Sequence, residues 1–91
     1  AKAGLLGLTY SAAKEYGASG VTVNAVLPGR IQTNMIAQRS KGRLDEWLAQ
    51  TPLNRLGKPE EVAGMINFLA SEMASYVTGA AINVNGGLVM G

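Results

Sequence analysis

Residues 21–29 read Val21-Thr22-Val23-Asn24-Ala25-Val26-Leu27-Pro28-Gly29, and this stretch decides the fold class. It is rich in β-branched residues and is apolar at alternate positions and again at Val26. That pattern is typical of a strand covered on both faces, as in a parallel sheet. Pro28-Gly29 ends the run abruptly, because proline and glycine both interrupt a strand. We therefore predict a buried strand over Val21–Leu27.

A helix precedes this strand. Apolar residues between Leu5 and Tyr16 recur with helical spacing, and Gly17 with Gly20 provides a stop. The start carries no capping residue, so we expect the chain to open inside a helix.

Three further elements follow the strand. Residues 30–54 are irregular and more polar, with a short amphipathic helix expected around Leu44, Trp47 and Leu48. Lys58-Pro59-Glu60-Glu61 predicts a helix start, because proline suits the first helical position and acids suit the first turn. Its apolar stripe, typical of a helix lying on a sheet, comprises Val62, Met65, Ile66 and Leu69. A second short strand is expected over Ala81–Val84, ended by Gly86-Gly87.

The predicted order is helix, strand, lid-like segment, helix, strand, which defines an α/β fold. Two strands joined through a helical crossover are parallel, and an isolated pair cannot cover both of its own faces. Either residues 1–91 are the C-terminal part of a larger α/β domain, or they need a partner.

Composition narrows the possible chemistry. The 91 residues are 47% hydrophobic and include no Cys and no His, and Asp45 is accompanied by only five Glu. Disulfides, thiolate nucleophiles and imidazole-based dyads or metal ligands are thereby excluded, and carboxylate metal cages and paired-carboxylate hydrolases are disfavoured. We expect no metal site.

The net charge of +2 does not indicate a nucleic-acid binder. Only Arg39, Lys41 and Arg43 cluster, and such a run is more typical of a solvated face than of a nucleic-acid footprint. No apolar run approaches membrane-spanning length and no signal-peptide pattern is visible, so we expect a cytoplasmic protein without membrane or nucleic-acid partners.

Two places could carry chemistry. Pro28-Gly29 ends a parallel strand, where open α/β sheets bind ligands, and Gly29 would let a flat ring approach the backbone. Ile31 and Thr33 then offer an amide and a hydroxyl. Taken alone, a Pro-Gly pair more often only ends a strand. Lys2, taken alone, would be an ordinary solvated lysine on a helix.

Considered jointly, the residues resemble the second half of a classical short-chain dehydrogenase/reductase, most closely the beta-ketoacyl carrier-protein reductase group. The likeness covers nearly the whole chain, and its joint spacing is far more specific than any one motif. It rests on Lys2-Ala3-Gly4, Leu8-Thr9, Ala13-Lys14-Glu15, residues 21–29, Ile31, Thr33, Met35, Pro52-Leu53, Arg55, Gly57, residues 58–63, residues 68–71, Tyr76, Thr78-Gly79 and Asn85-Gly86-Gly87.

The resemblance implies the C-terminal part of a doubly wound, Rossmann-type three-layer parallel sheet. Residues 1–91 would form the C-terminal half of one domain, with the N-terminal cofactor-binding half outside this sequence. The implied activity is hydride transfer between NADP or NAD and a ketone or secondary alcohol, including a 3-oxoacyl thioester of fatty acid biosynthesis.

The implied site residues are few. Lys2 matches the lysine of the family's Tyr-x-x-x-Lys motif and would both lower the pKa of the tyrosine and bind the nicotinamide ribose. Pro28 and Gly29 would pass alongside the nicotinamide ring, Ile31 would contact its carboxamide through the backbone, and Thr33 would complete that contact. Because the tyrosine, the serine and the glycine-rich turn are absent from residues 1–91, the segment alone would be inactive.

Departures from the family pattern leave the substrate open. Arg30 stands where an aromatic residue is frequent in the group, and Ser19 stands where a basic residue is frequent, so docking of an acidic carrier protein would fall to Arg39, Lys41 and Arg43. The family also implies a mobile substrate lid, which would hold Met35, Ile36, Trp47 and Leu48, although ordinary packing explains these four equally well.

A non-catalytic alternative stays open. The segment could instead contribute only an oligomer interface, since family members commonly form homotetramers through the first helix and through the second helix with the last strand.

Overall fold

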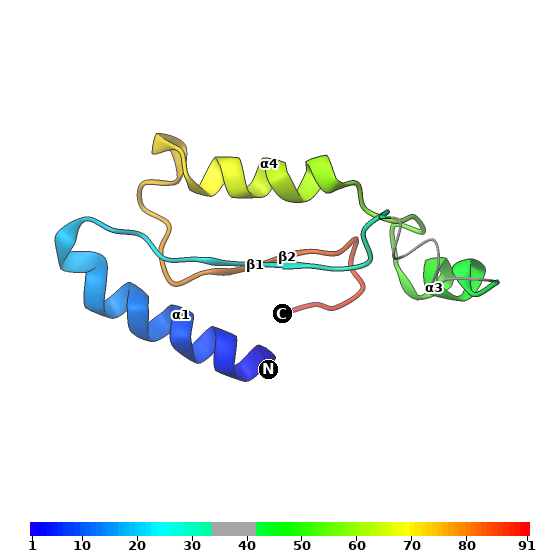
Figure 1. The fold of residues 1–91 in the computed structure, drawn as a ribbon, viewed down its shortest axis with the longest axis horizontal. Helices are drawn as coiled ribbons and strands as arrows, with labels where there is room; N and C mark the ends of the chain where they lie inside the picture. The colour runs from blue at the N-terminus through cyan, green and yellow to red at the C-terminus, as the bar shows by residue number, and fades with distance from the viewer. Residues whose placement is uncertain (34–41) are drawn as a thin grey trace. The chain divides into compact units, whose positions relative to one another are not determined.

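The computed structural model describes residues 1–33 and 42–91, which form two compact units. Unit 1 comprises residues 1–26 and 65–82, and unit 2 comprises residues 27–64 and 83–91. Along the chain (Figure 1) the elements are α1 (Lys2–Tyr16), the 3₁₀ turn η1 (Gly17–Ser19), β1 (Ala25–Pro28), α3 (Leu44–Gln50), α4 (Pro59–Leu69), the 3₁₀ turn η2 (Glu72–Ala74) and β2 (Ala81–Val84).

Strands β1 and β2 pair with each other in parallel. The amide of Ala25 donates to the carbonyl of Ala80, and the amide of Gly29 donates to that of Val84, both at 2.9 Å. From the first bond to the second, the donor moves from Ala25 to Gly29 and the acceptor from Ala80 to Val84, which is four residues in the same direction along each strand. This is the register of a parallel ladder. The predicted α/β class with a parallel pair is therefore confirmed, as is the strand over Ala81–Val84.

The prediction of a strand over Val21–Leu27 is wrong in its bounds, because β1 begins only at Ala25 and includes Pro28. The cause lies in the partner segment Val77–Ala80, which is a loop and offers no regular ladder. One backbone bond joins the two segments there, from the amide of Gly79 to the carbonyl of Val23 at 2.8 Å, and side chains make the others: Thr78 Oγ1 accepts from the amide of Val23 at 3.0 Å. Asn24 donates through Nδ2 to the carbonyl of Val77 and accepts through Oδ1 from the amide of Ala80, both at 3.0 Å.

Helix α1 has the predicted extent, and one side-chain hydrogen bond lies within it. Thr9 Oγ1 donates to the carbonyl of Leu5 at 2.8 Å, and Thr9 and Ala13 are the buried residues of the helix. Gly17 still has helical dihedrals, whereas Gly20 has a φ of 77°. Gly20 is therefore the left-handed stop that a residue with a β-carbon would adopt only at a cost.

Helices α3 and α4 confirm the two predicted downstream helices. Pro59 is the first residue of α4, and the helix presents Val62, Met65 and Leu69 half-buried, whereas Ile66 is 51% exposed. Most of the expected apolar stripe is thus only partly covered by the residues that the structure describes.

The core of the described residues is small. Its buried apolar side chains are all alanines, Ala13, Ala25 and Ala74, while larger ones such as Leu8 are exposed. Such a core removes little apolar surface from water, which matches the expectation that this pair of strands needs further cover. Within the same residues, no helix is both long and apolar enough to cross a membrane.

Candidate functional site

The expected site residues fall in different units. Lys2 lies exposed in the first turn of α1, in unit 1, whereas Pro28, Gly29, Ile31 and Thr33 form one continuous segment of unit 2. The structure therefore brings together the four residues expected along a nicotinamide. Met35, Ile36, Arg39 and Lys41 lie outside the described residues.

The segment after β1 is held by a second backbone partner, Gly57. The amide of Gln32 donates to the carbonyl of Gly57 at 2.8 Å, and the amide of Gly57 donates to the carbonyl of Arg30 at 3.0 Å. These two bonds form a parallel bridge between Ile31 and Gly57. In such a bridge the amide and carbonyl of the central residue face the opposite side, so those of Ile31 are directed away from Gly57. Ile31 thus presents a fixed donor and a fixed acceptor.

Glycine suits position 57, because the backbone here comes close to the end of the Ile31 side chain. A β-carbon at this position would come within 2.7 Å of the Cδ1 atom of Ile31. Glycine at residue 57 therefore lets the Ile31 side chain pack while its backbone is bridged, a role that the sequence pattern alone did not reveal.

The structure gives Gly29 a different neighbour from the one expected. A β-carbon on Gly29 would lie 2.5 Å from Cβ and 2.8 Å from Cα of Asn85. The space that a side chain would need is thus filled by the residue that follows β2. Clearance for a flat ring is not required to explain this glycine, because packing against Asn85 already demands it.

Asn85 organises the turn that follows β2. Its Oδ1 accepts from the amide of Gly87, and its Nδ2 donates to the carbonyl of Val89, both at 2.9 Å. Gly86 and Gly87 have φ values of 63° and 92°, in the region that favours glycine. Asn24 and Asn85 thus each hydrogen-bond to two backbone groups through the side chain.

An ion pair fixes the start of α4. Arg55 Nη1 and Nη2 each lie 2.8 Å from one carboxylate oxygen of Glu61, and the amide of Lys58 donates to Glu61 Oε1 at 2.9 Å. The hydrogen bond from Arg55, reinforced by that from Lys58, lowers the pKa of Glu61 to about 2, and the same bond raises the pKa of Arg55. Glu61 is therefore a carboxylate at neutral pH and has no spare proton for acid catalysis.

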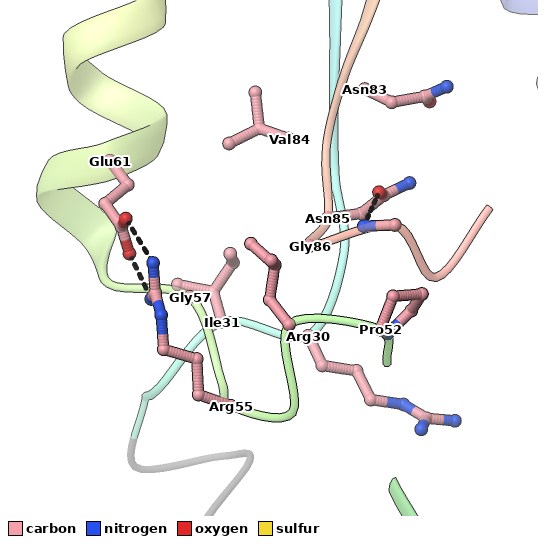
Figure 2. Close-up of a pocket in the computed structure, with 12 residues that line it drawn as sticks. Arg30, Ile31, Pro52, Arg55, Gly57, Glu61, Asn83, Val84, Asn85 and Gly86 are labelled. Carbon is pink, nitrogen blue, oxygen red and sulfur yellow. Dashed lines mark hydrogen bonds and ion pairs between the residues drawn. The ribbon is translucent and has the colours of Figure 1, made fainter. Parts of the chain in front are cut away.

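These groups surround a cavity of about 420 Å³ within unit 2. Figure 2 shows the Arg55–Glu61 pair on one side of it and the residues at the end of β2 on another. Its wall combines the end of β1, the loop before α4 and the end of β2: Arg30, Ile31, Pro52, Leu53, Arg55, Gly57, Glu61 and residues 83–87. The cavity therefore adjoins the segment in which the resemblance places cofactor contacts.

Comparison with known proteins defines the class. Residues 1–89 match the family model described as enoyl-(acyl carrier protein) reductase. This match agrees with the observed α/β fold and with the arrangement of the segment after β1. The chain belongs to the short-chain dehydrogenase/reductase family, whose solved members have the Rossmann fold.

Individual relatives are similar across almost the whole chain. The 3-oxoacyl-[acyl-carrier-protein] reductase FabG of Pseudomonas aeruginosa is 50% identical over 90 residues, which are 99% of this chain and 36% of that protein. The crystal structure of 3-oxoacyl-[acyl-carrier protein] reductase from Brucella melitensis superposes with a TM-score of 0.93 at 41% identity, covering 99% of this chain and 34% of that one. The crystal structure of YwfH, an NADPH-dependent reductase involved in bacilysin biosynthesis, superposes with a TM-score of 0.91 at 30% identity. The match covers 98% of this chain and 38% of that one. The chain thus spans about a third of the length of these relatives.

Proposed function

We propose that residues 1–91 form the C-terminal part of one Rossmann-type domain in an NAD(P)(H)-dependent reductase that acts on a 3-oxoacyl thioester. The observation that carries the proposal is the segment Pro28–Thr33. Its backbone is pinned to Gly57 so that the amide and carbonyl of Ile31 are presented at the end of a parallel strand, where α/β folds bind ligands. The names of the relatives favour the 3-oxoacyl substrate.

The proposed roles follow the chemistry of carbonyl reduction. A bound NAD(P)H would supply the hydride that reaches the carbonyl carbon. The carbonyl oxygen must then receive a proton, and the Tyr-x-x-x-Lys motif assigns that donor to a tyrosine preceding Ala1. Tyrosine has an ordinary pKa near 10, and lowering it by ~3 units takes roughly 4 kcal/mol of preferential phenolate stabilisation. The ammonium group of Lys2, one helical turn from that tyrosine, would contribute part of this stabilisation.

The cofactor would be held largely by backbone. Pro28 and Gly29 would border the nicotinamide, Ile31 would bond its carboxamide, and Thr33 would add a hydroxyl contact. We favour NADP over NAD because YwfH is described as an NADPH-dependent reductase. A cytoplasmic location and a role in fatty acid biosynthesis are part of the same proposal.

The test begins with the intact mass of the polypeptide purified from its source. A mass near 9.5 kDa would mean that no tyrosine precedes Lys2, and the proposed chemistry would fail. A mass nearly three times as large would fit the share of the relatives that this chain covers, 36% for the Pseudomonas aeruginosa protein. That polypeptide should then oxidise NADPH with a 3-oxoacyl thioester, whereas a 2-enoyl thioester serves as the comparison substrate because its reduction hydrogenates a carbon–carbon bond.

A carrier-linked substrate can be tested separately. Reversing the charge of Arg39, Lys41 and Arg43 together should raise the KM for a 3-oxoacyl carrier protein and leave that for a small free ketone unchanged. Equal effects on both substrates would contradict docking of an acidic carrier at this cluster.

A second candidate function, a purely structural oligomer segment, is favoured by the exposed apolar surface. Leu8 is 68% exposed on α1, and a β-carbon added at Gly4 or Gly7 of that helix would meet nothing within 4 Å. Such a surface could support the homotetramer common in the family. Sedimentation of a Gly7→Gln variant beside the wild type tests it: an unchanged oligomer would remove α1 from the interface.

A further inference from the structure

Arg30 joins β1 to helix α3 through three contacts of one guanidinium group. Its Nη1 atom donates to Gln50 Oε1 at 2.9 Å and to the carbonyl of Trp47 at 3.4 Å. Its Cζ atom lies 4.6 Å from the centroid of the Trp47 ring. Stacking and hydrogen bonding from a planar guanidinium are more specific than the charge alone, since lysine cannot reproduce both.

The site on α3 is suited to a cation. The carbonyl of Trp47 belongs to the last turn of Leu44–Gln50, where carbonyl groups lack intrahelical partners. It accepts from Arg30 and also from Thr51 Oγ1, at 3.1 Å. Thr51 is 6% exposed, so this end of the helix is held by the half-buried Arg30 and by a buried hydroxyl.

The other end of the connection is equally fixed. The backbone carbonyl of Arg30 accepts from the amide of Gly57 at 3.0 Å, and Arg30 lies between Gly29 and Ile31 in the proposed nicotinamide segment. Arg30 therefore joins α3, through its side chain, to a backbone segment that Gly57 already holds in place. This link lies wholly within unit 2.

We propose that Arg30, which also lines the cavity of unit 2, is a positioning residue that holds α3 beside the segment Pro28–Thr33 and thereby sets the affinity for the acyl substrate. The assignment rests on the proposed function. Arg30 acts through Trp47 and Gln50, and no chemical step passes through it.

The decisive variant is Arg30→Met in the native polypeptide that carries residues 1–91, with Arg30→Lys as the milder change. Losing the stacking and the two hydrogen bonds should raise the KM for a 3-oxoacyl thioester by about tenfold, with kcat and the KM for NADPH within about twofold of wild type. Arg30→Lys should show most of the same rise. Lys14→Met is the control, because Lys14 is an exposed cation of α1 in unit 1, whereas Arg30 and α3 belong to unit 2; its KM values should stay at the wild-type level.

Fluorescence of Trp47 supplies a readout that needs no substrate. The spectrum attributable to Trp47, obtained by subtracting that of Trp47→Phe, should change in Arg30→Met and Gln50→Ala and remain unchanged in Lys14→Met. If the wild type reduces no ketone, the proposed function fails, and this spectrum alone decides whether Arg30 positions α3. An unchanged spectrum, or a loss of kcat without a rise in KM, would overturn the proposal. If Arg30→Met does not fold, Gln50→Ala and Arg30→Lys carry the same two measurements.

Discussion

Replacing Gly29 by alanine separates two reasons for a glycine at the end of β1. If the residue exists to clear a nicotinamide ring, the protein without cofactor should tolerate a methyl group there. If it exists to clear Asn85, the methyl group collides with Cβ at 2.5 Å and with Cα at 2.8 Å whether or not a cofactor is bound. We expect the second result.

The magnitude follows from what Asn85 can do to relieve the contact. Forcing an extra methyl group into a packed site costs typically 1–3 kcal/mol, and a collision with main-chain Cα cannot be relieved by rotating a side chain. We therefore expect Gly29→Ala to lower the free energy of unfolding by ~3 kcal/mol, measured by urea unfolding of the polypeptide in the absence of NAD(P)H. Gly64→Ala is the matched control: it lies within α4 with nothing inside 4 Å, so alanine should raise stability by ~0.5–1 kcal/mol.

A double-mutant cycle identifies the partner. Asn85→Gly removes the 2.5 Å contact but also the hydrogen bonds to Gly87 and Val89, so alone it should destabilise. In the Gly29→Ala background it should cost less, with a coupling of ~1 kcal/mol or more. Cofactor-free stability of Gly29→Ala within ~0.5 kcal/mol of wild type, together with a raised KM for NADPH, would refute packing against Asn85 as the reason for this glycine.

Three further predictions concern other parts of the chain. Lys2→Ala should abolish ketone-dependent NADPH oxidation in the polypeptide that contains the upstream tyrosine, and normal turnover would refute its assigned role. The folded pKa of Glu61 is about 2, below its ordinary 4.5, so its contribution to stability is present above pH 4.5 and lost as the pH falls towards 2; thermal unfolding across that window should show a shallower acid decline in Glu61→Gln than in wild type. Asn24→Ala removes two hydrogen bonds to the loop before β2 and should cost ~2 kcal/mol in urea unfolding, with faster hydrogen exchange at the Ala80 amide; an unchanged exchange rate would show that Asn24 does not hold this loop.

The elements of the fold were predictable because their signals are local. Pro59 at the start of α4, the apolar spacing of α1 and the glycines after β2 each determine backbone conformation within a few residues. The bounds of β1 were not predictable in this way. Val21–Asn24 has strand composition, but whether it joins a ladder depends on the loop 56 residues further along that bonds to Asn24.

The sequence indicated which residues belong to the candidate site better than it indicated the contacts that they make. Family resemblance pointed to Lys2 and the segment Pro28–Thr33, and these assignments stay predictions. Residue spacing carried no signal that Asn85 would fill the space beside Gly29, or that Gly57 would bridge Ile31, because both contacts join segments distant in sequence. Arg30 stood out only as a departure from the family pattern, and its contacts with α3 needed coordinates.

The long separation between the two strands also determines when this part of the protein can acquire its structure. A chain is made at about 5–20 residues per second from its N-terminus, so β1 leaves the ribosome several seconds before β2 has been made. During that interval the backbone groups of Ala25 and Gly29 lack the partners that Ala80 and Val84 later provide. Pairing that closes so long a loop contributes to high contact order and slow folding. The nascent chain therefore carries an unpaired strand segment, which is the type of surface that chaperones shield and that seeds aggregation when they do not.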